Sequence, residues 1–230
     1  SSDQYLLLAT KNGMVKKTPI ADYANIRKTG LIAMTLRDDD QLIEAKLIDA
    51  GEDVMIGTRD GMAIRFNESD VRVTGRSSMG VRGISLDADD EVIGMQKLSQ
   101  GDYVLVVSEK GMGKLTHVDE FKAQKRGGKG LHCYRITEKT GKLVGFKLTA
   151  KEREIMLITN EGVIIRMSLK DAKDIGRNTS GVKFMNIDPD STTVIASIAK
   201  VRESTTEAYE AELAEAEAVP EDTEDVGEDN

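Results

Sequence analysis

Short apolar runs separated by polar turns recur along most of this chain and define the order of its expected elements. A run of five or six largely apolar residues opens each of four units, at 5–10, 54–58, 103–108 and 155–159. Each run is followed by a glycine-containing turn and a second short apolar run. Asn12-Gly13 and Asp60-Gly61 favour the hairpin turns that need positive φ. Each unit is therefore predicted to begin with a β-hairpin.

Two series of glycines keep the same spacing and indicate that the units are repeats. The hairpin glycines are 48, 50 and 51 residues apart, at Gly13, Gly61, Gly111 and Gly162. A second series is 50, 50 and 51 residues apart, at Gly30, Gly80, Gly130 and Gly181. Coincidence is a poor explanation for two series with one period, so we interpret the chain as four copies of a unit of roughly 50 residues.

Each unit contains two further apolar segments after its hairpin. The third predicted strands lie at 31–36, 81–86, 131–136 and 182–187, and a short turn separates each from a fourth strand. Four strands per period predict an all-β, propeller-like array, with four-stranded blades at about 4–50, 51–99, 100–150 and 151–200. Two β-sandwiches would also use short strands and frequent turns. The strict period favours blades.

The charge of the chain is divided unevenly. Residues 201–230 hold twelve acidic residues and one basic residue, a balance of −11. Of the 32 basic and 40 acidic residues in the chain, this leaves 31 basic and 28 acidic residues in 1–200, a balance of +3. The segment 201–230 is predicted to be a disordered acidic tail. The mildly basic body remains compatible with nucleic acid despite the overall pI near 5.

Cysteine content and hydropathy indicate the cellular compartment in which the protein is expected. Cys133 is the only cysteine, which excludes an internal disulfide framework and a cysteine zinc site within the chain. No apolar run approaches the roughly 18–20 residues that span a bilayer, and the first residues lack the basic region of a secretory signal. We expect a cytoplasmic protein without a membrane partner.

A basic, glycine-rich loop follows each hairpin. The third unit has the densest example, in the seven residues Gln124, Lys125, Arg126, Gly127, Gly128, Lys129 and Gly130. Cations beside glycines and small polar side chains suit contacts with phosphate groups. The other units place cations in the same stretch, at Arg27, Lys28, Arg76, Arg82, Arg177 and Lys183. The returning hairpin strands add Lys16, Lys17, Arg65, Lys114 and Arg166.

A solvated turn explains any one of these loops, but four copies in register would form a curved track along one rim. The predicted partner of this track is double-stranded DNA. Without tryptophan and with only four phenylalanines, the chain lacks a stacking platform for single strands. It also shows no recognition helix for reading bases. Sequence-tolerant contact with a bent duplex is the favoured interpretation, and a protein-interaction rim is the alternative.

Enzymatic interpretations have little support in the sequence. The chain contains no GxxxxGK[ST] phosphate loop, no GxSxG elbow and no HExxH motif. His132 and Cys133 are adjacent, so strand alternation sends them to opposite faces. The acidic stretches 38–40 and 87–90 lack the spacing of a calcium loop. We therefore assign no catalytic residue, no metal site and no cofactor to this chain.

Several motifs in order resemble the C-terminal domain of the DNA gyrase A subunit. The loop QKRGGKG at 124–130 is similar to the family's QRRGGRG or QRRGGKG box, and similar motifs lie at 9–19, 66–86 and 176–187. The resemblance covers about residues 4–200. It implies a β-pinwheel that wraps DNA around its rim and supports ATP-driven negative supercoiling by the holoenzyme. It also implies that the N-terminal cleavage core and the gyrase B protein are partners in an A2B2 assembly of the bacterial nucleoid, with ATP and magnesium used elsewhere in that assembly.

Two features depart from the family pattern. The family domain usually has six blades with its principal box near the first, whereas here four repeats are found and the box lies in the third. Lys125 replaces the usual arginine, which keeps the charge but loses a bidentate fork. The loop is therefore similar to a secondary box. The corresponding domain of topoisomerase IV, whose box is usually degenerate, is the nearest alternative.

Overall fold

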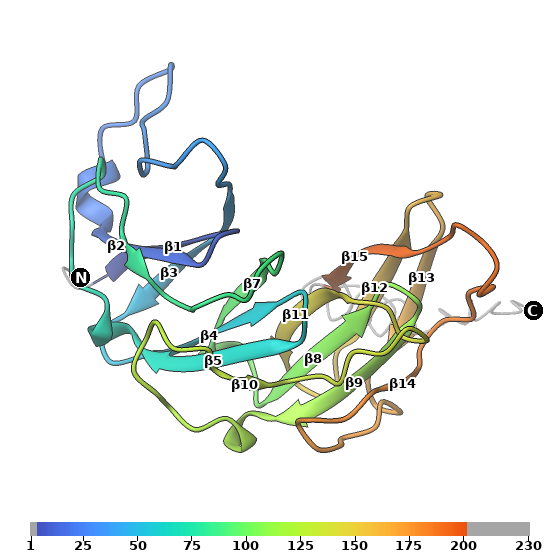
Figure 1. Ribbon diagram of the computed structural model, residues 1–230. Helices are drawn as coiled ribbons and strands as arrows, with labels where there is room; N and C mark the ends of the chain where they lie inside the picture. Colours follow the sequence, from blue (N-terminus) through green and yellow to red (C-terminus); the bar gives the residue numbers. More distant parts are fainter. Residues whose placement is uncertain (1–3, 202–230) are drawn as a thin grey trace, which may run out of the picture.

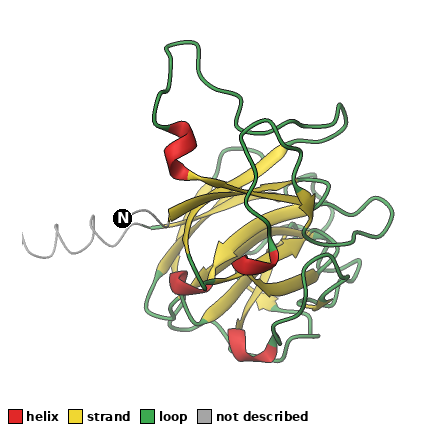
Figure 2. Cartoon of the chain, turned by 90° about the vertical axis from the view of Figure 1, so that its left-hand side faces the viewer, coloured by secondary structure: helices red, strands yellow, loops and turns green. Residues whose placement is uncertain are grey.

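The computed structural model describes residues 4–201 (Figure 1). The predicted acidic tail lies outside the described residues except for Val201. Within 4–201 the chain forms short strands and short 3-10 helices and no α-helix, so the prediction of an all-β fold is confirmed. Figure 2 shows that the helical structure is limited to short segments beside the strands, and each of them follows the end of a strand. No helix in these residues is long and apolar enough to cross a membrane.

The strands follow the predicted repeats along the chain. The first repeat contains β1 (Gln4–Thr10), β2 (Met14–Pro19), η1 (Ile20–Tyr23) and β3 (Leu42–Asp49). The second contains β4 (Asp53–Thr58), β5 (Met62–Asn67), η2 (Glu68–Asp70), β6 (Val81–Arg82) and β7 (Val92–Lys97). A short helix, η3 (Leu98–Gln100), lies at the boundary between the second and third repeats. The third repeat contains β8 (Tyr103–Ser108), β9 (Met112–His117), η4 (Val118–Glu120), β10 (Leu131–His132) and β11 (Leu143–Thr149). The fourth contains β12 (Glu154–Thr159), β13 (Ile164–Ser168), β14 (Val182–Lys183) and β15 (Ile195–Lys200).

All strand pairs within the sheets are antiparallel, and the hairpins form as predicted. Three sheets have four strands, in the orders β3-β1-β2-β6, β10-β5-β4-β7 and β11-β8-β9-β14. The fourth has three, in the order β13-β12-β15. Gly13 and Gly61 take φ values of 89° and 87° in the hairpin turns, a conformation that glycine adopts readily.

The third strand of each repeat does not complete its own sheet, which corrects the sequence-based expectation. Val81 of β6 lies opposite Val15 of β2, so the second repeat closes the sheet of the first. In the same way β10 pairs with β5, and β14 pairs with β9. These strands are two residues long, and the segment 31–36 forms no strand. A pattern of apolar residues indicates that a segment is extended but does not specify its partner.

The hydrophobic core lies between neighbouring repeats. Leu7 and Val15 of the first repeat pack with Ile56 and Phe66 of the second in one buried cluster. A second cluster joins the second and third repeats, and a third joins the third and fourth. Each cluster buries apolar side chains from two neighbouring repeats. Each repeat therefore depends on its neighbours for the burial of its apolar side chains.

The four sheets follow an open arc in which the fourth strands lie on the inner side (Figure 1). Strands β3, β7 and β11 lie next to one another in this order, and β15 follows β11. Gly57 shows how closely the sheets approach, because a Cβ there would lie 2.2 Å from the ring of Phe146. The opposite edge of each of the first three sheets carries a short shared strand, and the basic loop before that strand lies at the same edge.

Candidate nucleic-acid interface

The basic loop at 124–130 is held against the preceding repeat. The Gly127 N–H donates to the Gly83 carbonyl at 2.7 Å, and the Ser85 N–H donates to the Gly128 carbonyl at 2.9 Å. The Ser85 hydroxyl donates to the Gly127 carbonyl at 2.6 Å. The backbone of the loop is thus fixed by Gly83 and Ser85 of the second repeat. These hydrogen bonds do not involve the side chains of the loop.

The loops of the second and fourth repeats are attached in the same way. The Arg135 N–H donates to the Thr179 carbonyl at 3.1 Å, and the Ser180 hydroxyl donates to the Arg135 carbonyl at 2.7 Å. In the second repeat, the Thr35 N–H donates to the Ser78 carbonyl at 3.2 Å. Three basic loops therefore have equivalent positions along the outer edge of the arc.

Arg126 and Arg177 hold equivalent places in their loops and anchor them to the repeat before. The Arg126 guanidinium donates to the carbonyls of Asp70 and Arg82, both at 2.8 Å. The Arg177 guanidinium donates to the His132 carbonyl at 2.8 Å. Both side chains are half-buried. These arginines position the loops, although the sequence predicted them as direct DNA contacts.

The lysines of the 124–130 loop point into solvent. The Lys125 side chain is 93% exposed, with its ammonium 3.3 Å from the Asp70 carboxylate. Lys129 is also exposed and lies 3.1 Å from the equally exposed Asp87. Surface ion pairs of this kind contribute little, about 0–1 kcal/mol, so either lysine can exchange its partner for a phosphate.

The remaining predicted loop cations divide by exposure. Four are exposed, namely Arg27, Lys28, Arg82 and Lys183. Arg76 is half-buried. Gln124 is half-buried, and within the loop Gly128 is exposed while Gly127 and Gly130 are half-buried. Of these, Arg82 and Lys183 lie on β6 and β14, so they place exposed cations on the outer edges of two sheets.

One hollow gathers arginines from three repeats. It has a volume of about 540 Å³ and is lined by Asn12, Met14, Arg37, Asp40, Arg82, Arg126 and Gly127. Arg37 was missed by the sequence analysis because it belongs to a turn rather than to a glycine loop. Three arginines and one carboxylate, that of Asp40, line this open hollow, and this positive balance suits an anionic group such as a phosphate.

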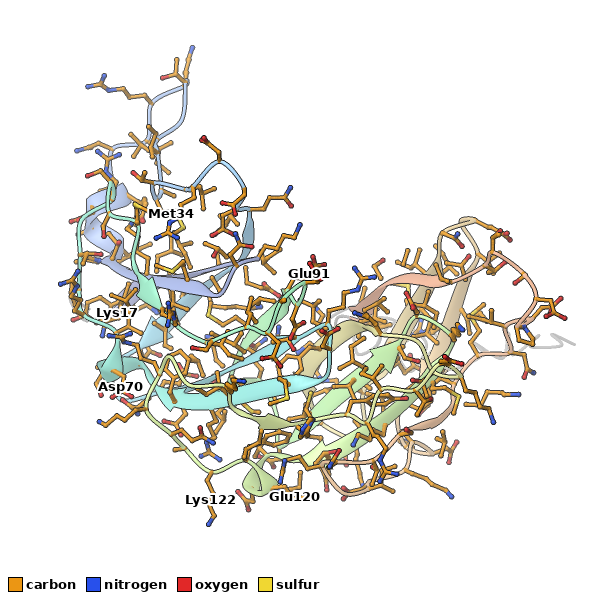
Figure 3. The ribbon with its side chains drawn as sticks, in the orientation of Figure 1. Lys17, Met34, Asp70, Glu91, Glu120 and Lys122 are labelled. Carbon is orange, nitrogen blue, oxygen red and sulfur yellow. The ribbon has the colours of Figure 1, made fainter. Side chains whose placement is uncertain are left out.

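The lysines of the hairpin strands do not reach the surface, which corrects their assignment as DNA contacts. Lys16, Lys17 and Lys114 are all buried. The Lys16 ammonium donates to the Ala33 carbonyl at 2.6 Å, and Lys17 forms a buried ion pair with Glu68 of the next repeat. Figure 3 shows Lys17 within the first blade, in contrast to Lys122, which extends away from the molecule.

Lys114 is the most completely buried of these lysines and supports the basic loop of the fourth repeat. Its ammonium donates to the carbonyls of Gly176 and Arg177, both at 2.7 Å, and to the Thr179 hydroxyl at 3.1 Å. It also lies 5.6 Å from the centre of the Tyr134 ring, within range of a cation–π contact. Lys114 therefore fixes the conformation of the loop at 176–179 from the buried side of the sheet edge.

Arg65 and Arg166 are engaged by carboxylates within their own hairpins. The Arg65 Nε lies 2.9 Å from the Asp53 carboxylate, and its guanidinium also donates to the Phe121 carbonyl at 3.3 Å. The Arg166 Nε lies 2.7 Å from the Glu154 carboxylate. Arg65 is held in a largely covered ion pair, whereas Arg166 is 53% exposed and its ion pair lies at the surface.

A further row of cations escaped the sequence analysis. Arg72, Lys122 and Lys173 are exposed, and each follows a buried apolar residue at the same place in its repeat. They are 50 and 51 residues apart, the period already given by the glycines. Aligning the repeats position by position, rather than inspecting only the glycine loops, would have found them.

His132 and Cys133 form no catalytic pair. His132 is exposed, whereas Cys133 is buried, and burial raises the pKa of its thiol to about 12. A thiol with so high a pKa stays protonated at neutral pH and is a poor nucleophile.

We expect the buried ammonium of Lys114 to make stability depend on pH. Burial lowers its pKa from 10.5 to about 8, so between these values the unfolded chain binds a proton that the folded chain has released. The folded state therefore gains stability as pH rises from about 8 to 10.5, by on the order of 3 kcal/mol. Below pH 8 both states carry the proton and this gain is absent.

Denaturant unfolding of the wild type and of Lys114→Met at pH values on either side of this window checks the prediction. The difference in unfolding free energy between the two proteins should move in favour of the wild type at the higher pH. Other titrating groups are common to both proteins and cancel in the difference. A difference that is the same at both pH values would contradict a lowered pKa at Lys114.

The fold and the loops together define a propeller-like DNA-topology domain, a class supported by comparison with known proteins. The model of the family described as DNA gyrase C-terminal domain, beta-propeller, matches residues 4–49, 52–99, 102–150 and 153–200. The chain belongs to this family of gyrase A C-terminal domains.

Relatives and solved structures agree with this assignment. The DNA gyrase A protein of Ureaplasma parvum is 43% identical over 183 residues, which cover 80% of this chain and 22% of the relative. The gyrase A protein of Staphylococcus aureus strain MRSA252 is 39% identical over 214 residues, covering 92% of this chain and 24% of the relative. The chain thus spans about a quarter of the length of these relatives.

Two solved structures share the fold of the chain. A structure of the DNA gyrase A C-terminal domain superposes with a TM-score of 0.78 at 28% identity, covering 88% of this chain and 67% of that one. The C-terminal domain of a DNA topoisomerase IV gives a TM-score of 0.83 at 27% identity, covering 93% and 67%. The propeller-like assignment is confirmed.

Proposed function

We propose that this chain binds and bends duplex DNA along the outer edge of its arc as the wrapping domain of a DNA gyrase A protein. The observation that carries the proposal is the repeated attachment of three basic loops at equivalent positions. Each loop is fixed by backbone hydrogen bonds to the preceding repeat, and Lys125, Lys129 and Lys183 are left exposed. Distributed cations of this kind hold the phosphate backbone without reading sequence.

Bending is part of the proposal because the cations follow a curved edge. Bending a site of some 20–30 bp through 40–90° costs on the order of 1–6 kcal/mol, which the phosphate contacts must offset. The exposed row of Arg72, Lys122 and Lys173 adds contacts of the same type. A duplex that follows both rows would neutralise several phosphates in each repeat.

Within a complete gyrase, we propose that the chain acts together with the N-terminal cleavage core of the gyrase A protein and with the gyrase B protein in an A2B2 assembly. The assembly would use ATP and magnesium outside this chain to introduce negative supercoils in the bacterial cytoplasm, at the nucleoid. The relatives, which are DNA gyrase A proteins, support this placement. The wrapping domain would determine the direction of supercoiling by presenting a looped segment to the cleavage core.

The corresponding domain of topoisomerase IV is a second candidate, since one such domain superposes on this chain with a TM-score of 0.83. The preserved loop QKRGGKG favours gyrase, because the topoisomerase IV box is usually degenerate. Wrapping of relaxed circular DNA, read as a change in linking number after ligation, distinguishes the two. A constrained change supports a wrapping gyrase domain, and binding without any change supports the alternative.

A gel-shift titration with linear duplex DNA tests the proposed function directly. For six to ten phosphate contacts, affinity should fall by about 10³–10⁵ between roughly 50 mM and 200 mM salt. Two duplexes of unrelated sequence should bind alike, because no base contacts are proposed. Absence of binding at low salt, or binding that salt does not weaken, would overturn the DNA proposal in favour of a protein-interaction rim.

We also propose that the acidic segment 201–230 competes with DNA for the basic loops. The segment 201–230 has a net charge of −11, whereas residues 1–200 have a net charge of +3. Because opposite charges attract, removing the segment should raise the affinity for DNA. The same gel-shift titration on a chain cut after Lys200 checks this at low salt, where attraction between exposed charges is least screened. Unchanged affinity after the cut would count against competition.

A further inference from the structure

The hollow of about 540 Å³ beside the first hairpin turn is built by three consecutive repeats, and we call it the arginine hollow. Arg37 comes from the turn that precedes β3 in the first repeat, Arg82 from β6 of the second, and Arg126 from the loop 124–130 of the third. Because β6 pairs with β2, the three arginines meet where the first two repeats share a sheet. The hollow therefore depends on the stacking of repeats and not on any one of them.

Two of these arginines have unused side chains. Arg37 and Arg82 are exposed, and neither guanidinium makes a hydrogen bond or an ion pair with another residue of 4–201. Arg65, by contrast, lies 2.9 Å from its carboxylate partner Asp53. A guanidinium has five N–H donors and no acceptor. Arg37 and Arg82 therefore keep all their donors for another molecule.

The third arginine is held in place and still has donors to offer. The Arg126 Nε donates to the Asp70 carbonyl and its Nη1 to the Arg82 carbonyl, both at 2.8 Å. These two bonds leave other N–H groups of the guanidinium unused. A side chain that is already fixed loses little conformational freedom when it binds an anion. Arg126 thus presents pre-oriented donors at the wall of the hollow.

The one carboxylate in the lining, that of Asp40, is engaged by the backbone of its own repeat. Its Oδ1 accepts from the Asn12 N–H at 2.9 Å and from the Gln41 N–H at 2.8 Å. Within the part of the chain that the structure describes, it forms no ion pair with an arginine of the hollow. Asp40 therefore shapes the turn and leaves the positive balance of three arginines against one carboxylate.

The equivalent place one repeat further along has a different charge. Carboxylates and a histidine replace the two unused arginines and the asparagine of the hollow, namely Asp87 for Arg37, Asp60 for Asn12 and His132 for Arg82. Asp87 lies 3.1 Å from Lys129, and Asp60 lies 2.8 Å from Lys142. At this second place the carboxylates thus occupy nearby cations. The set of unpaired arginines belongs to the first place and is not a general feature of the repeat.

A further repeat before the first would leave the arginine hollow open. Asp87 holds the place of Arg37 in the second repeat, and its side chain is 69% exposed although the first repeat precedes it. The turn at 37–40 is attached to its own hairpin, since the Asn12 side-chain amide donates to the Asp39 carbonyl at 3.3 Å. The walls of the hollow come from the first three repeats, and a preceding repeat is not needed to form them.

We propose that the arginine hollow binds one phosphate group, held by Arg37, Arg82 and Arg126. The planar fork of a guanidinium matches the oxygens of a phosphate and can bind two of them at once. The position favours the DNA backbone as the source of this group, because Arg126 and Gly127 belong to the basic loop 124–130. That source rests on the proposed function. The site itself does not, since a free phosphorylated compound has the same chemistry.

Titration calorimetry of the 230-residue chain with inorganic pyrophosphate tests the site without DNA. At low salt, where exposed charges are least screened, we expect saturable binding at a single site. Arg37→Ala and Arg82→Ala should each weaken this binding about ten-fold, because each removes a charge-assisted hydrogen bond. Neither side chain has an internal partner to lose, whereas Arg126→Ala would also release the loop from the repeat before.

The matched control is Arg59→Ala, which removes the same charge from a surface ion pair with Glu91, 3.8 Å away and outside the hollow. This variant should bind pyrophosphate as the wild type does. Absence of saturable binding by the wild type would refute the proposal. Arg37→Ala and Arg82→Ala variants that bind no more weakly than Arg59→Ala would also refute it, because any loss would then reflect overall charge.

A gel-shift titration of Arg37→Ala with linear duplex DNA identifies the source of the phosphate group. If DNA supplies it, the slope of log affinity against log salt should fall by about 0.9. An unchanged slope, together with weakened pyrophosphate binding, identifies a free phosphorylated compound instead. A chain that binds pyrophosphate through these arginines but does not bind DNA would keep the site and refute the proposed function, so the two can fail separately.

Discussion

The affinity for duplex DNA falls by roughly two to three decades near 0.1 M salt when Lys125, Lys129 and Lys183 are all replaced by alanine. All three side chains are exposed at the outer edge of the arc. Each phosphate contact on B-DNA adds about 0.9 to the dependence of log affinity on log salt, so the triple variant should lose about 2.7 from that slope. Gel-shift titrations at several salt concentrations measure both quantities.

A matched control removes the same charge from the opposite edge. Lys46, Lys97 and Lys147 lie on β3, β7 and β11, the strands on the inner side of the arc. Their triple alanine variant has the same net charge as the loop variant and should keep the wild-type salt slope. If both triple variants lose the slope equally, general electrostatic attraction and not the loops accounts for binding.

Lys17→Met lowers the free energy of unfolding by about 3–5 kcal/mol, because it leaves the buried Glu68 carboxylate without its partner. Lys17 belongs to β2 of the first repeat and Glu68 to η2 of the second, so the pair spans two repeats. The Glu68 carboxylate also accepts from the Gly51 N–H at 2.9 Å. The double variant Lys17→Met/Glu68→Gln should recover much of the loss, since a neutral amide can still accept from Gly51. Denaturant unfolding measures each step.

The exposed pair of Lys129 and Asp87 is the matched comparison for this buried pair. Lys129→Met should change the free energy of unfolding by no more than about 1 kcal/mol. The folded Lys17→Met protein should bind DNA with the wild-type salt slope, because the ammonium of Lys17 does not reach the surface. If the Lys17→Met protein instead loses about 0.9 from the slope of log affinity against log salt, Lys17 contacts a phosphate after all.

The hairpins and the period of the repeats were predictable because both depend on local sequence. Positive φ at Gly13 and Gly61 is a local requirement of the turn, and the structure shows it at both glycines. The partner of the third strand was not predictable in this way. Val81 has the same apolar character whether it closes its own sheet or that of the first repeat, and only the arrangement of the repeats in space decides between them.

Burial of the hairpin lysines was missed for a related reason. Strand alternation suggests that a lysine beside a buried residue faces solvent, yet Lys114 and Leu115 are both fully buried. In a stack of sheets, both faces of a middle strand are covered by other repeats, so alternation no longer separates inside from outside. Lys125 and Lys129 are exposed because glycine-rich loops at a sheet edge have no covering layer.

The sharing of strands between repeats also bears on cooperativity. Because β6 belongs to the second repeat in sequence and to the first in its hydrogen bonds, neither repeat can unfold alone without opening its neighbour. Such coupling through nearest neighbours makes a linear array behave as one unit whose weakest points are its ends. A deletion at a repeat boundary in the sequence would cut across a sheet, whereas a clean excision must follow the hydrogen bonds from one hairpin to the short strand that closes it.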